Sequence, residues 1–456
     1  MNQADGQRWR DGAAYADRWL GYRREFRDLP GLVVTVRHDQ DLLLSAAYGF
    51  ARLEPPLPMT TRHLFRIASH SKTFTATAIL QLVEQGRLRL DDRAAQYLPW
   101  LPVQVTLRQL LNHTSGTIRD GHDASFWQVE APFPDREQLR ATASGGAVLE
   151  ANQAFKYSNI GYGVLGLVLE AVTGGTYNDY VRERIIRRLA LDEAGPEPGP
   201  DVSDQLVTGY SRARLGVPRQ AIPGTIDTRA LSPATGFYAS AEDLARYAAA
   251  HWPGDDRLLS EASKREMQQP YWSIEQADEH YGLGFSFRQV GQRRLFGHGG
   301  GFPGQSTRTL IDPQDRLVVV VLCNATASDA LAAPLAETVV KILDFALGRP
   351  AVPQAPAVAE LDRFSGRFAN LWGTTDIVRF GQTLVATTPE ADDPVARVTE
   401  LRVVDGDTLR VVSGGGYGSV GEPVRYARDG AGRTTHITTG GVRSYAEDVF
   451  RARYAT

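Results

Sequence analysis

The first 347 residues alternate between the hydrophobic period of helices and that of strands. Residues 8–29 carry the pattern of an amphipathic helix, and two apolar runs within residues 31–51 flank a polar turn and predict a β-hairpin. Apolar positions at helical spacing after Ser69 predict a buried helix that opens at this serine. The other elements predicted here are a short capped helix after Thr106, an apolar helix after Asn159, a helix over 176–191, a capped helix after Ser240, three antiparallel strands within 281–287, 293–300 and 308–324, and a helix over 331–347.

The pattern changes after residue 347. Three prolines among small residues predict a linker over residues 348–360. Residues 361–456 hold six to eight short runs rich in Val, Thr, Leu and Arg, separated by glycine-containing turns, and show no helical period. This pattern predicts a small closed barrel or sandwich. The predicted organisation is a mixed α and β domain over residues 1–347, the linker, and an all-β domain over residues 361–456.

Bulk composition narrows the classes of function. Apolar residues make up 42% and charged residues 23% of the 456 residues, as in a soluble globular protein. The formal net charge of -3 gives no electrostatic basis for binding nucleic acid or an anionic membrane. No apolar run is long enough to span a bilayer, and the N-terminus lacks the apolar core of a signal peptide, so a cytoplasmic location is expected. The single cysteine, Cys323, excludes an internal disulfide and is predicted to be a core thiol.

Ser69 and Lys72 are the first candidates for chemistry. Residues three apart in a helix share a face, so this hydroxyl and this amine can touch. A helix N-terminus also presents unpaired N–H groups and a partial positive charge, which suits a serine whose attack creates an oxyanion. Only four of the 50 Lys and Arg residues are lysines, and among them only Lys72 follows a serine by three positions. Such a position favours an amine that can lose its proton, which Arg cannot do.

A second candidate is the turn that carries Tyr157 and Asn159, the only Tyr-x-Asn among 17 tyrosines. A buried phenol beside an ammonium is expected to favour its anionic form, because an opposite charge lowers its pKa. It could then exchange protons with the serine and with a leaving group. Asn159 can hydrogen-bond the Lys72 amine or a substrate carbonyl. Without the serine and lysine, the turn would indicate only a buried tyrosine.

The third candidate is the glycine-rich stretch around His298. Small residues on both sides of this histidine, on a predicted edge strand, would let a substrate approach the backbone closely. Gly300 belongs to this stretch, and the N–H of Gly301 is expected to pair with that of Ser69 as an oxyanion hole. The alternative is a glycine-rich hairpin turn with a surface histidine.

His113 and the irregular segment 117–152 complete the candidates. No second histidine or carboxylate lies at metal-ligand spacing from His113, which is therefore predicted to be a structural, hydrogen-bonded residue. Long irregular segments near a site often line a pocket, so residues 117–152 are expected to contact the substrate.

The three motifs, in this order and at these separations, resemble the serine β-lactamase and penicillin-binding-protein superfamily, in particular its class C β-lactamase-like branch with family VIII esterases, D-aminopeptidases and D-amino-acid amidases. The resemblance runs from about residue 20 to residue 347. It implies an α+β fold in which an antiparallel sheet is flanked by helices and joined by a helical subdomain. The all-β region resembles, more distantly, the lipocalin-like barrel found behind such domains. Accessory motifs that share the resemblance are HTSG (113–116), SAEDLA (240–245) and YGLG (281–284).

The resemblance also implies a role for each residue. Ser69 would be the acylated nucleophile and Lys72 its general base. Tyr157 would protonate the leaving group and then activate the deacylating water. Asn159 would orient the amine and the substrate carbonyl, and His298 would stand where many relatives have a lysine. No metal or organic cofactor is expected.

The chain departs from true β-lactamases at the third motif. A neutral imidazole at residue 298 anchors a carboxylate less well than an ammonium, and Gly299 lacks the hydroxyl found there. Efficient β-lactamase activity is therefore not expected, whereas slow acylation by penicillins stays open.

Several functions stay open at this point. A peptidase or amidase, a carboxylesterase and an acyltransferase would share this site, and a binding or sensing protein would acylate once without turnover. The expected partner is a small ester, amide or short peptide, without nucleic acid or membrane, and the oligomeric state is open.

Overall fold

The computed structural model describes residues 3–102, 104–326, 331–350, 360–414 and 420–454. The chain forms two compact units, one made of residues 29–336 and the other of the described residues of 1–28 and 337–456. Most of the predicted linker, residues 351–359, lies outside the described residues. The domain boundaries at residues 347 and 361 stay a prediction.

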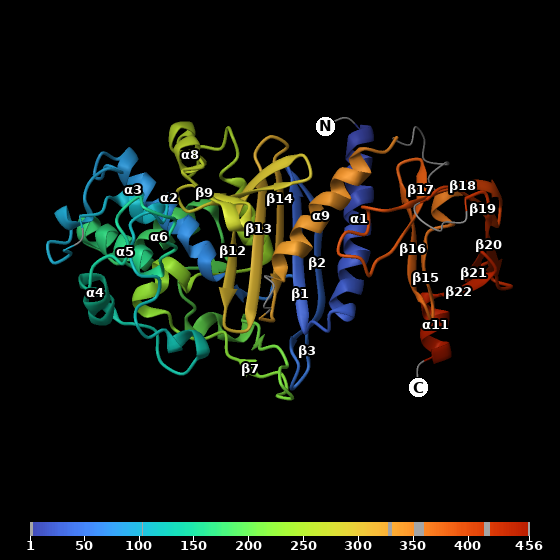
Figure 1. Ribbon diagram of the computed structural model, residues 1–456, viewed down its shortest axis with the longest axis horizontal. Coiled ribbons are helices and arrows are strands. Elements are labelled where there is room, and N and C mark those ends of the chain that lie inside the picture. Colours follow the sequence, from blue (N-terminus) through green and yellow to red (C-terminus); the bar gives the residue numbers. More distant parts are fainter. Residues whose placement is uncertain (1–2, 103, 327–330, 351–359, 415–419, 455–456) are drawn as a thin grey trace. The chain divides into compact units, whose positions relative to one another are not determined.

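A nine-stranded antiparallel sheet forms the frame of the larger unit (Figure 1). The predicted hairpin of residues 31–51 is present, and Cys323 is buried in the inner strand β14, as a core thiol should be. The single strand predicted over 308–324 is wrong, because the turn after Asp312 divides it into a hairpin. In spatial order the strands are β3 (Leu57–Pro58), β2 (Asp41–Arg52), β1 (Gly31–His38), β14 (Leu317–Cys323), β13 (Gln305–Asp312), β12 (Arg293–Phe302), β11 (Ser286–Val290), β10 (Glu279–Tyr281) and β9 (Trp272–Ile274).

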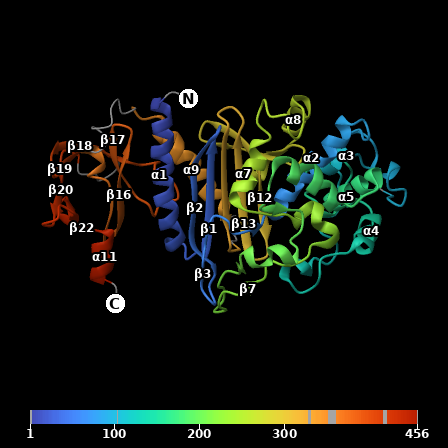
Figure 2. The same ribbon diagram turned by 180° about the vertical axis from the view of Figure 1, so that it is seen from behind.

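Helices cover one face of this sheet and extend into a helical region. Helix α7 packs on β1, β13 and β14, as Figure 2 shows from behind. Helix α2 is buried over nearly its whole length and packs on α5. The helices of this unit are α2 (Ser71–Glu84), α3 (Leu107–Leu111), α4 (Arg136–Ser144), α5 (Asn159–Thr173), α6 (Tyr177–Val181), α7 (Ala241–Ala249) and α8 (Glu261–Met267). Two small sheets complete it: a three-stranded sheet of β4 (Phe65–Arg66), β8 (Tyr238–Ala239) and β5 (Ala194–Gly195), and a two-stranded sheet of β6 (Gly209–Tyr210) and β7 (Ala221–Ile222).

Local capping explains where several helices begin. Thr106 and Gln109 form the predicted capping box of α3, and the Ser240 hydroxyl accepts the N–H of Asp243 at the start of α7. The helix predicted to open at Ser69 begins two residues later, at Ser71. The single helix predicted over 176–191 is also wrong, since α6 passes into a π turn and then a 3-10 turn.

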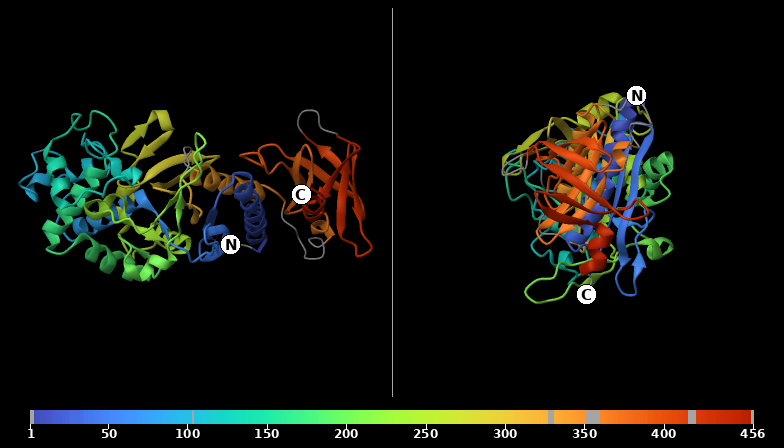
Figure 3. Two further views of the ribbon diagram at one scale, coloured as in Figure 1. Left: turned by 90° about the horizontal axis from the view of Figure 1, so that it is seen from below. Right: turned by 90° about the vertical axis from the view of Figure 1, so that its right-hand side faces the viewer.

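The smaller unit contains a closed eight-stranded antiparallel barrel (Figure 3), one of the two folds predicted from the short runs between glycine-containing turns. Two helices, α1 (Gln3–Phe26) and most of α9 (Ala332–Leu347), belong to this unit. The expectation of no helix beyond residue 361 is wrong, because α11 (Glu447–Tyr454) follows the last strand. The barrel strands are β15 (Gly366–Asn370), β16 (Gly373–Phe380), β17 (Thr383–Thr387), β18 (Thr399–Asp405), β19 (Thr408–Ser413), β20 (Pro423–Arg428), β21 (Thr434–Thr439) and β22 (Val442–Ala446).

Buried polar contacts tie the N-terminal helix to the barrel within this unit. The Asp11 carboxylate on α1 accepts two hydrogen bonds of 2.8 Å from the Arg379 guanidinium on β16 and one of 3.0 Å from the N–H of Gly381. Both charged side chains are buried. Such a bidentate pair fixes orientation as well as adding energy, so α1 is held in a defined position in this unit.

Candidate active site

Ser69 lies at a break between two buried elements. It is the middle residue of a 3-10 turn, Ala68–His70, that leads directly into α2. Ala68 has a φ of 47°, a left-handed conformation that costs a non-glycine residue about 1–3 kcal/mol. Within residues 64–82, Ser69 is the one residue that is not buried. The strained turn therefore leaves a single hydroxyl accessible on an otherwise closed core.

Lys72 lies in the first turn of α2, and its side chain is fully buried. Its Nζ donates to Ser69 Oγ at 3.3 Å, to Asn159 Oδ1 at 2.7 Å and to the carbonyl of Ala234 at 2.8 Å. Burial lowers the pKa of Lys72 well below its usual value, although Asp120 raises it through space. A buried amine with a depressed pKa can be neutral near neutral pH, as a general base must be.

Tyr157 completes the group around Ser69, and its protonation differs from the prediction. Its phenol is hydrogen-bonded to Ser69, and Lys72 Nζ lies 4.7 Å from the centre of its ring. Burial raises the pKa of Tyr157, and the opposing effects of Ser69 and Arg119 are smaller. The anionic phenol predicted from the sequence is therefore wrong, because desolvation outweighs nearby positive charge. The neutral phenol is a proton donor.

Asn159, the first residue of α5, links the amine to a carboxylate that the sequence did not single out. Its Oδ1 accepts from Lys72, and its Nδ2 donates to Asp120 Oδ1 at 2.6 Å. Asp120 in turn pairs with Arg119 Nε at 3.1 Å. Because the amide nitrogen faces a carboxylate, the amide oxygen must face the amine. The only sequence signal for Asp120 is its position in the segment 117–152.

His298 on β12 is buried. Its Nδ1 donates to the carbonyl of Gly299 at 2.6 Å, so its Nε2 accepts from the Tyr281 hydroxyl at 3.0 Å. Burial, His70 and Lys72 hold the pKa of His298 well below its usual value, and the ring is neutral. Both ring nitrogens thus have partners within the protein. A direct contact of His298 with substrate stays a prediction.

Gly300 and Gly301 lie on a bare edge of β12 close to Ser69. Strand β11 pairs with β12 only as far as Gly297, so the described sheet leaves the edge of residues 298–302 open. A Cβ on Gly300 would lie 2.2 Å from the carbonyl oxygen of Ile67, just before the Ser69 turn. A Cβ on Gly301 would meet nothing within 4 Å. The strand therefore approaches the serine turn through backbone alone, with open space beside Gly301.

His113 lies behind Tyr157, with the two ring centroids 4.3 Å apart. Its Nδ1 accepts the N–H of Ser158 at 3.1 Å, and its side chain is buried. This hydrogen-bonded position agrees with the structural role predicted for it. The contact helps to fix the turn between Tyr157 and Asn159.

A groove of about 930 Å³ opens along the bare edge of β12. Gly299, Gly300 and Gly301 line it, together with Trp127 and Val129 from the segment 117–152. The segment therefore borders a cavity beside Gly300 and Gly301, although Ser69, Lys72 and Tyr157 are not among the residues that line this groove. Its contact with substrate remains a prediction.

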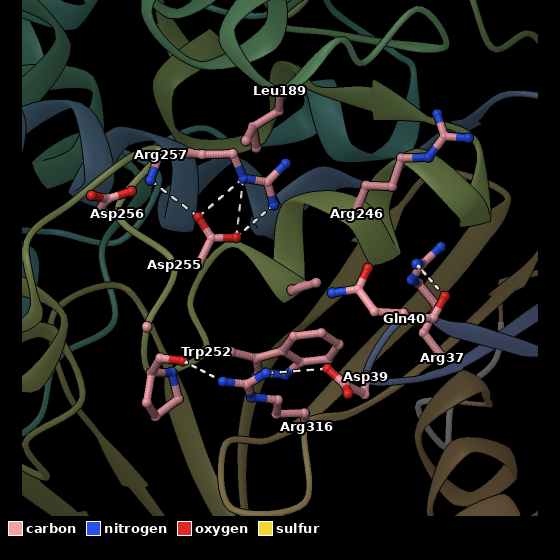
Figure 4. A pocket seen from close by; sticks show the side chains of 13 residues that line it. Arg37, Asp39, Gln40, Leu189, Arg246, Trp252, Asp255, Asp256, Arg257 and Arg316 are labelled. Carbon is pink, nitrogen blue, oxygen red and sulfur yellow. Dashed lines mark hydrogen bonds and ion pairs between the residues drawn. The ribbon is translucent and has the colours of Figure 1, made fainter. Parts of the chain in front are cut away.

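A second pocket, of about 500 Å³, has none of the predicted site residues in its lining (Figure 4). Its charges largely pair with one another: Arg316 donates to Asp39 at 3.1 Å, and Arg257 donates to both carboxylate oxygens of Asp255. Its lining residues offer no serine, cysteine or histidine as a nucleophile or base. The groove beside β12 differs in that two of the predicted site residues, Gly300 and Gly301, line it.

Over the described residues, no three His, Cys, Asp or Glu side chains are gathered as a metal ion would require. None of the described helices combines the length and apolarity needed to cross a bilayer.

The sequence and the fold are both similar to those of known proteins. A family model described as Beta-lactamase matches residues 16–343. Penicillin-binding protein 4* of Bacillus subtilis is 27% identical over 355 residues, which cover 74% of this chain and 76% of that protein. The D-aminopeptidase of Brucella anthropi is 27% identical over 329 residues, which cover 70% of this chain and 59% of that protein. The structure of the octameric penicillin-binding protein homologue from Pyrococcus abyssi matches with a TM-score of 0.67 and 21% identity, covering 95% of this chain and 99% of that chain, which shows a shared fold.

Proposed function

The chain belongs to the beta-lactamase family, and from this premise we propose that it is a serine hydrolase that cleaves a small ester, amide or peptide through an acyl-Ser69 intermediate. The observation that carries the proposal is the distance of 3.3 Å between Lys72 Nζ and Ser69 Oγ. Burial lowers the pKa of this amine, so that it can accept the hydroxyl proton. An adjacent base of this kind is what turns a serine into a nucleophile.

In the proposed acylation, Lys72 Nζ takes the proton of Ser69 as Oγ attacks the substrate carbonyl carbon. The N–H groups of Ser69 and Gly301 hold the oxyanion. Phe302 and Gln305 close a two-residue hairpin, and hydrogen bonding alternates along an antiparallel strand, which directs the N–H of Gly301 to the free edge of β12. When the tetrahedral intermediate collapses, the neutral Tyr157 gives its proton to the leaving group.

Deacylation reverses these proton transfers. The Tyr157 phenolate, stabilised by the Lys72 ammonium, takes a proton from water, and the resulting hydroxide attacks the acyl carbonyl. Ser69 Oγ then leaves and recovers its proton from Lys72. Each group returns to its starting protonation state, so no further base is needed. Asn159 keeps the amine in position throughout, because Asp120 fixes its amide.

The names of the similar proteins support a class of substrate for this chain. The similar D-aminopeptidase supports a small amide or peptide of a D-residue. An ester would be cleaved by the same steps with an easier leaving group, and an acyltransferase would replace the deacylating water with an acceptor. The amidase, esterase and acyltransferase alternatives all form an acyl group on Ser69. They differ in the leaving group of the substrate or in the molecule, water or an acceptor, that removes the acyl group.

A second candidate is a penicillin-binding protein that acylates slowly and turns over little. The similar protein from Bacillus subtilis, which carries that name, favours it. In this case the chemistry at Ser69 would stop after acylation.

A substrate panel on the wild type and Ser69→Ala tests both candidates. It contains p-nitrophenyl esters, D- and L-amino-acid p-nitroanilides, and nitrocefin. The hydrolase proposal predicts steady turnover of at least one ester or anilide, lost in Ser69→Ala. A burst of one equivalent without turnover would favour the second candidate, and turnover retained in Ser69→Ala would refute both.

A further inference from the structure

The pocket of Figure 4, of about 500 Å³, lies where the turns after β1 and β13 meet the end of α7. Arg37 on β1, Arg246 on α7 and residues 252–257 after this helix border it. A cavity of this size is typical of sites that bind small molecules. Its described lining contains no member of the group around Ser69, so the pocket is separate from the proposed reaction site.

Arg37 is a half-buried cation that lacks a carboxylate partner. Among the described residues, its guanidinium donates to the backbone carbonyl of Gln40 at 3.5 Å and forms no ion pair. Burial lowers the pKa of Arg37, and the charge of Arg246 lowers it further, while Glu242 opposes both through space. A cation in this environment is stabilised by an added anion.

Arg246 lies on the same side of the pocket as Arg37 (Figure 4). Its Nη1 pairs with Asp243 at 2.9 Å, and its side chain is 48% exposed. Because a guanidinium has five N–H donors, this pair leaves Arg246 with donors for a ligand. Guanidinium groups recognise carboxylates and phosphates through such paired donors.

The aspartates of the pocket do not neutralise Arg37. Two of the three form ion pairs with Arg316 and Arg257. The third, Asp256, is exposed and lies across the pocket from Arg37 in Figure 4. The side of the pocket beside Arg37 therefore carries a positive charge that the lining does not balance.

Apolar side chains border the rest of the cavity. Leu189, Trp252 and Pro253 contribute to its lining. A bare carboxylate or phosphate would fill only a small part of this volume. The combination suits a ligand that has both an anionic group and an organic body.

We propose that this pocket binds a small organic anion, with its carboxylate or phosphate between Arg37 and Arg246 and its body against Trp252. The site is a second ligand site of the chain, in addition to the one at Ser69. It does not depend on the proposed function, because no step of the reaction involves these residues.

Calorimetric titration of Ser69→Ala, which excludes turnover, tests the site with phenyl phosphate, phenylacetate and the neutral phenylacetamide. At least one of the two anions should bind at one site per chain. It should bind at least tenfold more tightly than phenylacetamide, since a hydrogen bond to a charged group is worth roughly that factor or more. Tighter binding of phenyl phosphate would identify a phosphate ligand, and tighter binding of phenylacetate a carboxylate ligand.

Arg37→Gln in the same background should weaken binding of the preferred anion at least tenfold. Arg288→Gln is the matched control, because Arg288 is another partly buried arginine of the same sheet. It pairs with Glu279 at 2.8 Å and does not line the pocket, so its replacement should leave the affinity unchanged.

Asp39→Asn should act in the opposite direction and tighten binding at least threefold. It removes a negative charge from the lining and releases Arg316 from its ion pair. Asparagine tolerates the left-handed φ of 51° at this residue, so the turn is preserved. A role of these residues in folding alone would not produce a gain in affinity.

Three outcomes overturn the inference: no binding of either anion at millimolar concentration, equal binding of phenylacetamide, or undiminished binding in Arg37→Gln. Weaker binding in Asp39→Asn would also contradict it. If Arg37→Gln does not fold by thermal melting, Arg37→Lys takes its place and should weaken binding at least threefold, because lysine lacks the planar fork of donors. Unchanged affinity in that variant overturns the inference equally.

Discussion

The Lys72 amine donates to three uncharged acceptors, the Ser69 hydroxyl, the Asn159 amide oxygen and the Ala234 carbonyl. Asp120 acts on it only through space, across Asn159. Hydrogen bonds alone therefore hold the amine in place, while desolvation sets its pKa. Three donated hydrogen bonds use the three protons of the ammonium; the neutral amine keeps two N–H groups for Asn159 and Ala234, and its lone pair can then accept the Ser69 proton.

Replacing Lys72 with Met should lower kcat/KM for a p-nitrophenyl ester by about a thousandfold or more, because members of a jointly acting unit fail together. In the wild type the rate should rise with pH through an apparent pKa well below 10.5, since the active amine is the neutral one. Assays between pH 5 and 10 measure both effects. Lys264→Met is the control, because this second buried lysine donates to the carbonyls of Trp252 and Asp255 away from the site. Near-full activity in Lys72→Met would exclude it as the base.

Asp120→Asn should move the acid limb of that pH profile to lower pH. The Asp120 charge raises the pKa of Lys72, so its removal lets the amine lose its proton at a lower pH. The new amide can still accept from Asn159, which preserves the position of the amine. The exposed neighbour Asp123, changed to Asn, serves as the control and should leave the profile in place. A shift to higher pH would contradict the role given to Asp120.

At this scale the sequence predicts residues whose spacing within one element brings them together. Ser69 and Lys72 lie three residues apart, in the 3-10 turn and the first turn of α2, and Tyr157 and Asn159 lie two apart at the start of α5, so both pairs could be singled out. Asp120 and the Ala234 carbonyl come from distant loops that no spacing connects. The protonation of Tyr157 was mispredicted because it depends on how much solvent the fold removes, which residue types alone do not give.

Strand β12 and the serine turn form the contact between elements on which the site depends. Gly300 touches the Ile67 carbonyl, whereas Gly301 faces open space one residue later. The two glycines thus have opposite surroundings on the same strand. Substituting each glycine in turn therefore distinguishes the effect of lost packing between β12 and the turn from the general effect of replacing a glycine.

Gly300→Ala should lower the unfolding free energy by about 1–3 kcal/mol, because the added methyl overlaps backbone that can move only with the turn. It should also lower kcat by about a hundredfold, as a displacement of Ser69 near 1 Å would. Gly301→Ala should change the unfolding free energy by less than about 0.5 kcal/mol. Chemical denaturation and ester assays measure these effects. Equal destabilisation by the two substitutions would contradict the close contact of β12 with the turn.

The existence of an element was predicted best where a hydrophobic pattern continues over many residues. The positions where elements begin and end were predicted worst. The hairpin of β1 and β2 was predicted from two apolar runs around a polar turn, and the barrel strands from short runs between glycine-containing turns. The missed turn between β13 and β14 has a visible cause, since the Asp312 carboxylate accepts the N–H groups of Gln314 and Asp315. The sequence Asp-Pro-Gln-Asp is typical of a turn. The turn was missed because the long apolar run that follows resembles a continuation of the same strand.

For the whole molecule, the grouping of α1 with the barrel gives residues 3–28 a role in the smaller unit. The buried pair of Asp11 and Arg379 joins segments almost 370 positions apart in sequence. No pattern in either segment indicates the other, so this grouping could not be predicted from the sequence.

Asp11→Ala should lower the unfolding free energy of the smaller unit by about 1.5–3 kcal/mol, because it removes both hydrogen bonds of the buried pair and leaves Asp362, at 2.6 Å from Nε, as the carboxylate paired with Arg379. Lys341→Ala is the control within the same unit, since Lys341 pairs with Asp393 at 3.1 Å but is 39% exposed, and a surface pair contributes about 1 kcal/mol or less. Scanning calorimetry measures both variants. If Asp11→Ala melts like the wild type, α1 is not held by this pair.

The account as a whole requires that the hydroxyl of Ser69 becomes covalently modified during the reaction. Peptide mass spectrometry after treatment with a fluorophosphonate, or with a slowly hydrolysed ester, locates the adduct directly. We predict one equivalent of label on the peptide that contains Ser69, and its loss in Lys72→Met. A label on any other residue, or equal labelling at Ser69 without the lysine, would contradict the proposed chemistry.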